Sequence, residues 1–225
     1  MNFTESLKTK IESLHLLRHP FYQAWMAGEL SKDQLRYYTD QYFPFVRAFP
    51  CFVSATHSLC EDLSARRYLT ENLAEEEGFP TNSSHPELWL QFAAGLGLSS
   101  ESVMSAKIGA KAKELAETFH NLCRSSYSEG LGALYAYEYQ SPEVAKFKIE
   151  GLKKHFGISD EPTTAFFKVH ETADLLHSET AARLLDQLSP EEQGLASKAA
   201  QRAGQALWDF LTEVDHESKK VCSLH

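Results

Sequence analysis

The stretch AFFKVHETADLLHSETAARLL, residues 165–185, sets ionisable side chains into an apolar helical stripe. His170, Asp174 and His177 are spaced i, i+4 and i+7, which places them in one narrow strip of a helix. The apolar residues that continue this strip are Phe166, Phe167, Ala181 and Leu184. An ionised carboxylate in an apolar interior normally takes up a proton unless a countercharge is present. The stretch therefore predicts a buried helix that carries a polar site with its own countercharge.

A glutamate occupies the apolar face of a second predicted helix, SARRYLTENLAEEEG, residues 64–78. Glu76 follows the leucines of this helix by three and seven residues, so it shares their buried face. Of its two neighbours, Glu75 is predicted to point away and Glu77 is rotated off the stripe by about 100°. Periodicity therefore selects Glu76 among the three glutamates.

Further polar residues complete a set that suits a metal site. Glu138 lies on the packed side of GLGALYAYEYQ, residues 130–140, and His85 follows the Glu76 helix after a short turn. A mixed shell of histidines and carboxylates favours iron or manganese over thiolate-preferring metals. Carboxylates from facing helices are also typical of metal-binding helical bundles. We therefore predict a site for two dications, formed by Glu76, His85, Glu138, His170, Asp174 and His177.

Other interpretations of the same residues stay open at this point. Surface ion pairs or a polar seam between helices would also place His170, Asp174 and His177 on one face, and a buried histidine such as His85 is often only a hydrogen-bonded core residue. His57 and His120 have no carboxylate on the same face, so we interpret both as structural.

The rest of the chain predicts an all-α protein. Apolar residues recur at helical spacing nearly throughout, without a convincing alternating strand pattern. Capping boxes that begin at Ser31 and Ser189 and glycines at 78 and 157 mark helix ends, which gives about eight helices. Pro44 falls inside an aromatic helix, where it predicts a kink. No linker divides the chain, so we predict one domain over residues 1–225, with a frayed tail over 216–225.

Composition excludes several classes of function. Arginine and lysine number 22 against 31 acidic residues, and this acidic balance argues against a nucleic-acid-binding face. No stretch approaches the roughly 18 apolar residues of a membrane span. The N-terminus has no secretory h-region, and the four cysteines are widely spaced without a CxxC pair. These features favour a cytoplasmic protein with reduced thiols, and they predict neither nucleic acid nor a membrane as a partner.

Several segments resemble one known family over nearly the whole chain. They are HPFYQAWMAGELSKDQLRYY, RAFPCFVSATHSLCEDLSARR, NLAEEEGFP, GALYAYEYQ, KIEGLKKHFG and HETADLLHSE. The chain resembles the family of the Chlamydia protein associating with death domains. The members of this family are haem-oxygenase-like di-metal oxidases related to pyrroloquinoline-quinone synthase and thiaminase II. The resemblance implies a haem-oxygenase-like helical bundle and places the family's six metal ligands on the residues selected above. The spacing before His85 differs from the family by two residues.

The resemblance also implies an activity, which is the synthesis of 4-aminobenzoate for folate from one of the protein's own tyrosines. It places that tyrosine at Tyr22, the lysine that donates the amino group at Lys148, and a second participating tyrosine at Tyr38. The implied cofactors are iron, with manganese as a possible second ion, and the implied oxidant is O2 with an external reductant.

A second function remains open at this stage. The family name records binding to host death domains, so the chain is alternatively an interaction protein that promotes apoptosis after secretion into a host cell without a signal peptide. A homodimer is expected from the resemblance alone. A thiaminase would need a nucleophilic cysteine in its pocket, and the cysteines here make no clear case for one.

Overall fold

The computed structural model describes residues 2–80 and 82–222, and regular structure within these ranges is helical, without a strand. The helices are α1 (Phe3–Ile11), α2 (Pro20–Ala27), α3 (Lys32–Ser58), α4 (Leu63–Glu76), α5 (His85–Gly95), α6 (Ser100–Met104), α7 (Ala110–Ser125), α8 (Tyr127–Glu138), α9 (Ser141–Phe156), α10 (Glu161–Gln187) and α11 (Pro190–Cys222). Two short 3₁₀ turns, Glu12–Leu14 and Leu16–Arg18, join α1 to α2. None of the described helices combines the length and the apolar character that crossing a bilayer requires.

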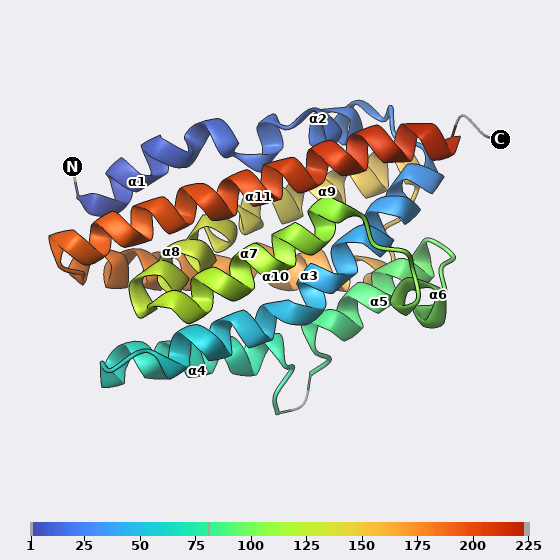
Figure 1. The fold of residues 1–225 in the computed structure, drawn as a ribbon. Coiled ribbons are helices and arrows are strands. Elements are labelled where there is room, and N and C mark those ends of the chain that lie inside the picture. Colours follow the sequence, from blue (N-terminus) through green and yellow to red (C-terminus); the bar gives the residue numbers. More distant parts are fainter. Residues whose placement is uncertain (1, 81, 223–225) are drawn as a thin grey trace.

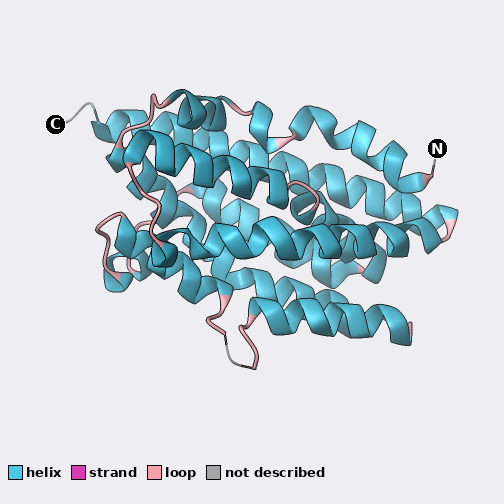
Figure 2. Cartoon of the chain, turned by 180° about the vertical axis from the view of Figure 1, so that it is seen from behind, coloured by secondary structure: helices cyan, strands magenta, loops and turns pink. Residues whose placement is uncertain are grey.

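The helices form an elongated bundle (Figure 1). Helices α1 and α2 lie along α11 on one side, and α4 and α5 lie on the opposite side, with the remaining long helices between them. Short loops connect most of the elements, as the view from behind shows (Figure 2). The predicted all-α class is confirmed.

The sequence signals for helix ends are also confirmed. Ser31 forms a capping box with Gln34 at the start of α3, and Ser189 pairs with Glu192 in the same way at the start of α11. Gly157 caps α9 in the left-handed conformation. Helix α3 contains Pro44 in its interior, and the kink that the sequence predicts there stays a prediction.

The predicted frayed tail is wrong for residues 216–222, which continue α11. Ser218 is fully buried, and its hydroxyl lies 3.4 Å from the Gln34 side chain of α3. Lys219 forms an ion pair one turn back with Asp215, at 2.6 Å. This buried anchor and the pairing along the helix stabilise a segment whose polar composition suggested disorder; residues 223–225 lie outside the described ranges.

Small residues bring α8 and α11 close together, and α8 is the helix that ends at Glu138. A Cβ added to Gly132 would lie only 2.3 Å from the Ala196 carbonyl oxygen of α11. On the α11 side the small residues are Ala196, Ala199, Ala200 and Ala203, each at most 1% exposed. The interface therefore depends on the absence of a side chain at Gly132.

We expect Gly132→Ala to lower the free energy of unfolding by about 1–3 kcal/mol, because the added methyl group overpacks a backbone contact. Gly194→Ala is the matched control on α11, where an added Cβ meets nothing within 4 Å. That change should raise stability by about 0.5–1 kcal/mol, the usual gain in a helix. Chemical denaturation measures both, and equal midpoints for Gly132→Ala and the parent protein would rule out the tight contact.

Candidate metal centre

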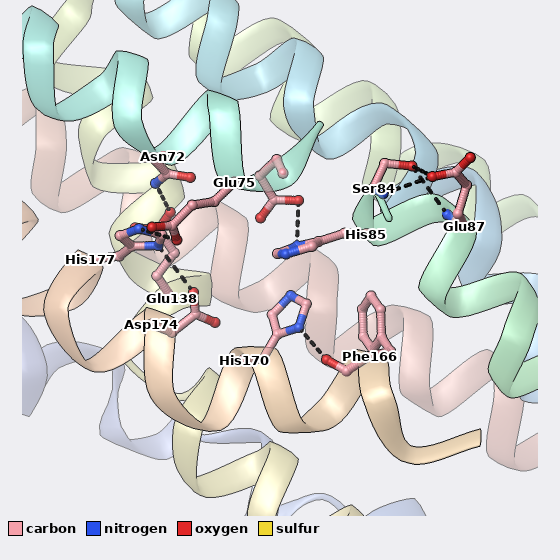
Figure 3. A network of polar contacts seen from close by, with 11 residues as sticks. Asn72, Glu75, Ser84, His85, Glu87, Glu138, Phe166, His170, Asp174 and His177 are labelled. Atoms are coloured by element: carbon pink, nitrogen blue, oxygen red, sulfur yellow. Dashed lines mark hydrogen bonds and ion pairs between the residues drawn. The ribbon is translucent and has the colours of Figure 1, made fainter. Parts of the chain in front are cut away.

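Four helices place six ionisable side chains at one buried locus (Figure 3). Helix α4 contributes its last residue, Glu76, α5 its first, His85, and α8 its last, Glu138. The other three side chains come from successive turns of α10, and all six residues are at most 5% exposed. The structure thus brings together all six residues that the sequence predicted as ligands.

One half of the cluster contains Glu76, His85 and His170. A ligand atom from each of them lies within 4.8 Å of the others. His85 Nδ1 lies 2.8 Å from Glu76 Oε2, and the imidazole centroids of His85 and His170 are 4.5 Å apart. A capping box between Ser84 and Glu87 fixes the first turn of α5 and so places His85. This arrangement matches three ligands of a single ion.

The hydrogen bond of His170 fixes its tautomer. His170 Nδ1 lies 2.6 Å from the Phe166 carbonyl oxygen, one turn earlier on α10. A carbonyl only accepts, so Nδ1 carries the proton and donates it. The lone pair is then on Nε2, which is the usual way in which a hydrogen bond prepares a histidine to bind a metal.

The other half of the cluster contains Glu138, Asp174 and His177. Asn72 Nδ2 donates to Glu138 Oε1 at 2.8 Å, and His177 Nδ1 lies 3.4 Å from Asp174 Oδ1. Tyr68 donates to the His177 carbonyl oxygen at 2.8 Å and so ties α4 to this turn of α10. Three potential ligands therefore face one another beside the first group (Figure 3).

Glu75 also reaches this half of the cluster, contrary to the sequence prediction that it points away. Its Oε2 lies 3.0 Å from His177 Nε2, although half of the Glu75 side chain is exposed. Periodicity describes where Cβ points, whereas a glutamate at the edge of the stripe has enough length to turn back toward the site. Asn72 was also missed, although it stands four residues before Glu76 on the same buried face.

Unpartnered atoms show that this donor set fits metal ions. His85 Nδ1, His177 Nδ1 and Asp174 Oδ2 are buried and have no hydrogen-bond partner. The two imidazole nitrogens lie 2.8 Å from Glu76 and 3.4 Å from Asp174 without forming a hydrogen bond with either carboxylate. Buried polar atoms rarely lack a partner unless water or an ion supplies it.

The pKa values of Glu138 and His177 are both raised, so the cluster binds protons more readily than the free side chains do. Burial raises the pKa of Glu138 to about 8, and the neighbouring carboxylates add to this shift. Burial opposes a charge on His177, but Asp174, Glu138 and Glu75 together raise its pKa to about 9. Protons thus bind where carboxylates crowd in a dry interior, and divalent cations supply the same countercharge.

A second buried cluster joins Tyr22, Tyr38 and Lys148. The two phenol oxygens are 3.2 Å apart, and Lys148 Nζ donates to the Tyr38 oxygen at 2.9 Å. The same nitrogen lies 5.0 Å from the centroid of the Tyr22 ring. Burial alone lowers the pKa of Lys148 to about 7 and raises that of Tyr22. The three residues that the family resemblance implied are therefore in mutual contact.

A small cavity connects the two clusters. It has a volume of about 20 Å³, and Tyr22 and Lys148 of the aromatic cluster and His170 of the ligand cluster all line it. Tyr137 lines this cavity and also a smaller one that borders Glu76 and His85. The aromatic cluster and the ligand candidate His170 thus border the same cavity.

Histidines outside the cluster have structural surroundings. His19 caps α2 by accepting from the Phe21 amide, and its Nε2 lies 3.0 Å from the Thr212 hydroxyl. His120 contacts Arg124 at 3.0 Å on the surface of α7. Neither lies among the residues that line the site.

Comparisons with known proteins show what the chain is similar to. The chain is 41% identical to the 4-aminobenzoate synthase of Chlamydia muridarum over 94% of this chain and 89% of that protein. It is 38% identical to the 4-aminobenzoate synthase of Nitrosomonas europaea over 99% and 98% of the two chains. A solved domain from Shewanella denitrificans, described as having a haem-oxygenase-like fold, superposes with a TM-score of 0.79 at 17% identity, covering 98% of this chain and 93% of that one. This confirms the predicted fold.

The family itself is shown by a model that covers most of the chain. The model, described as an iron-containing redox enzyme, matches residues 36–209, a range that includes all six buried ligand candidates and Lys148. The chain therefore belongs to the haem-oxygenase-like family of iron-containing redox enzymes.

Proposed function

We propose that this oxidoreductase makes 4-aminobenzoate from its own Tyr22 side chain, with Lys148 as the source of the amino group. The names of the relatives support the product, and the family supports an iron-dependent oxidation. The metal pair is iron with either iron or manganese, held by the six buried side chains of α4, α5, α8 and α10. When bound, these ions supply activation of O2 with electrons from an external reductant.

The volume beside Tyr22 carries the proposal. A cavity of about 20 Å³ accommodates one water molecule or a diatomic gas. A free aromatic amino acid does not fit there, whereas the Tyr22 ring already lines the wall. An oxidisable phenol that shares this cavity with His170 is thus part of the chain.

The product's skeleton fits a tyrosine side chain. 4-Aminobenzoate contains an aromatic ring, one carboxyl carbon and a nitrogen para to it, and tyrosine supplies the ring, Cβ and a para oxygen. The reaction breaks Cα–Cβ and leaves a hydrogen on Cα, so that residue 22 becomes a glycine. It oxidises Cβ to a carboxyl group at the expense of O2 and the external reductant, and it replaces the phenol oxygen, which leaves as water. Lys148 Nζ condenses with the oxidised ring carbon. A proton shift from Cε then moves the C=N bond onto Cε and restores the aromatic ring, and hydrolysis of this second imine releases the arylamine and leaves Lys148 Cε as an aldehyde.

The surroundings of Lys148 prepare it for this role. A pKa of about 7 keeps a large fraction of the amine neutral at cellular pH, and only the neutral amine is a nucleophile. Its hydrogen bond to Tyr38 holds Nζ beside the Tyr22 ring. Tyr38 in turn contacts the Tyr22 hydroxyl, which gives the phenolic proton a hydrogen-bonded partner when Tyr22 is oxidised.

The comparisons favour this enzyme over the interaction protein that the sequence left open. The relatives at about 40% identity carry the name of an enzyme, and the family model describes redox chemistry. A protein that acts only by docking to a death domain has no need for six convergent buried ligands.

Growth without 4-aminobenzoate tests the proposal. We expect the chain to restore growth of a bacterium that lacks its usual 4-aminobenzoate genes, and we expect His177→Ala to fail, because a potential metal ligand is lost. The exposed Glu77, on the same α4 terminus, provides the control, and Glu77→Gln should rescue as the parent does. Rescue by His177→Ala at the parent's level would contradict a metal-dependent reaction.

A further inference from the structure

His170 and His177 are the first and last of the three ligand candidates on α10. The partner that fixes each ring contacts Nδ1 in His170 but Nε2 in His177. His170 uses Nδ1 to donate to the Phe166 carbonyl oxygen, which leaves Nε2 for a metal. His177 has Nε2 against Glu75 at 3.0 Å, and its other nitrogen, Nδ1, is buried without a hydrogen-bond partner. Each ring thus has one nitrogen occupied and the other turned inward.

His177 needs a side-chain partner that fixes the orientation of its ring. His177 is tied to α4 through its backbone, because Tyr68 donates to its carbonyl oxygen, and that bond leaves the ring free to rotate. An imidazole without a hydrogen-bond partner can rotate, so neither of its nitrogens is fixed in the direction of a metal. A carboxylate on Nε2 holds that N–H on the outer side of the ring and turns Nδ1 toward Asp174, 3.4 Å away, which is the side on which a metal ion would bind in place of the Nδ1 proton.

We propose that Glu75 is a positioning residue that orients His177 for metal binding, as the outer carboxylate of a carboxylate–histidine–metal triad. The inference rests on the metal site of the proposed function. Its donor geometry fits such a triad, in which a carboxylate binds the imidazole N–H that faces away from the metal and increases the basicity of the other nitrogen. Figure 3 shows the Glu75 side chain turned toward His177, beside Glu138 and Asp174.

Exposure separates Glu75 from the ligand candidates. Half of its side chain is exposed, whereas the His177 side chain is 5% exposed, so the pair spans the boundary between solvent and site. An exposed ion pair contributes little to folding stability. Its removal should therefore leave the fold intact and act on the metal, which makes the role measurable.

Affinity for Fe(II), measured anaerobically by competition with a chelator, tests the proposal. We expect Glu75→Gln to weaken Fe(II) binding about 10–100-fold, the usual effect of losing such an outer partner. The control Glu77→Gln removes the same charge from the same end of α4 and should bind Fe(II) as the parent does. Unchanged affinity in Glu75→Gln would overturn the proposal.

A double-variant cycle shows whether Glu75 acts through His177. In a His177→Ala background we expect Glu75→Gln to have no further effect, because the ring that it orients is gone. An equal loss in both backgrounds would mean that Glu75 acts only through its charge, which contradicts positioning.

The same cycle separates this inference from the proposed function. Loss of Fe(II) in His177→Ala with normal binding in Glu75→Gln would reject only the role of Glu75. Normal binding in His177→Ala would reject the ligand assignment itself, and the positioning role with it.

Discussion

Tyr22→Phe abolishes 4-aminobenzoate formation while leaving the metal content near that of the parent protein; this is the largest effect that we expect. The phenol O–H that permits oxidation is lost, and the carbon that must receive nitrogen no longer carries an oxygen. No potential ligand is altered, and the ring still fills its place among Phe21, Trp25 and Tyr38. Product measured by chromatography, together with metal analysis, checks both parts.

The amount of product formed per chain tests the same reaction. Because Tyr22 is covalently tethered beside the site, no binding step is needed, and positioning can replace an effective concentration on the order of 10⁵ M or more. Product should therefore saturate at no more than one equivalent per chain. Protein made with ring-labelled tyrosine should give labelled 4-aminobenzoate even when free tyrosine is unlabelled.

Two variants separate the source of the ring from its surroundings. Lys148→Arg keeps a long side chain with N–H donors but has no transferable primary amine, so it should also make no product. Tyr37→Phe, which changes the partly exposed neighbour of Tyr38, should make product as the parent does. Many turnovers on added tyrosine, or unlabelled product from labelled protein, would show that Tyr22 only lines the cavity.

Removal of a buried carboxylate should release the metal without unfolding the protein. Asp174→Ala and Glu138→Ala each take away one of the carboxylates that offset the charge of the ions, and we expect iron per chain to fall at least about tenfold. Helical content should remain close to that of the parent, because most of the buried core surrounds the site and does not include these residues. Elemental analysis and circular dichroism measure the two quantities.

The control for this experiment differs from the one that the sequence alone would select. Periodicity turns Glu75 away from the site, which would make Glu75→Ala a neutral substitution; its contact with His177 removes that expectation. Glu77 is the appropriate control, and iron content unchanged in both Asp174→Ala and Glu138→Ala would show that the ligand assignment is wrong.

The buried ligand candidates were predictable because their types conflict with their positions. A histidine or carboxylate on an apolar helical face needs a partner, and the spacing of His170, Asp174 and His177 identifies one shared face. What periodicity could not give is distance between helices. The contact of Lys148 with Tyr38 joins α9 to α3, and no local pattern in either helix encodes it.

Sequence reasoning failed where a single side chain or a local anchor decides the outcome. Glu75 reaches His177 through the length and rotamers of its side chain, which a pattern of Cβ directions does not contain. Likewise, the helical course of residues 216–222 depends on one fully buried serine in a polar segment. Only the packed structure reveals such contacts.

The burial of Tyr22 has a consequence for the lifetime of the protein. Its side chain is 2% exposed and packs in the aromatic core, so departure of the ring as product leaves a void where a phenol group stood. Truncation of a buried aromatic residue typically lowers stability by about 3–5 kcal/mol, a large share of the roughly 5–15 kcal/mol that holds a domain folded. On the proposed reaction, we therefore expect a reacted chain to open more often than an unreacted one and to be removed preferentially by cellular proteases. If Tyr22 is the source of the ring, each used molecule should thus be degraded sooner than an unreacted one.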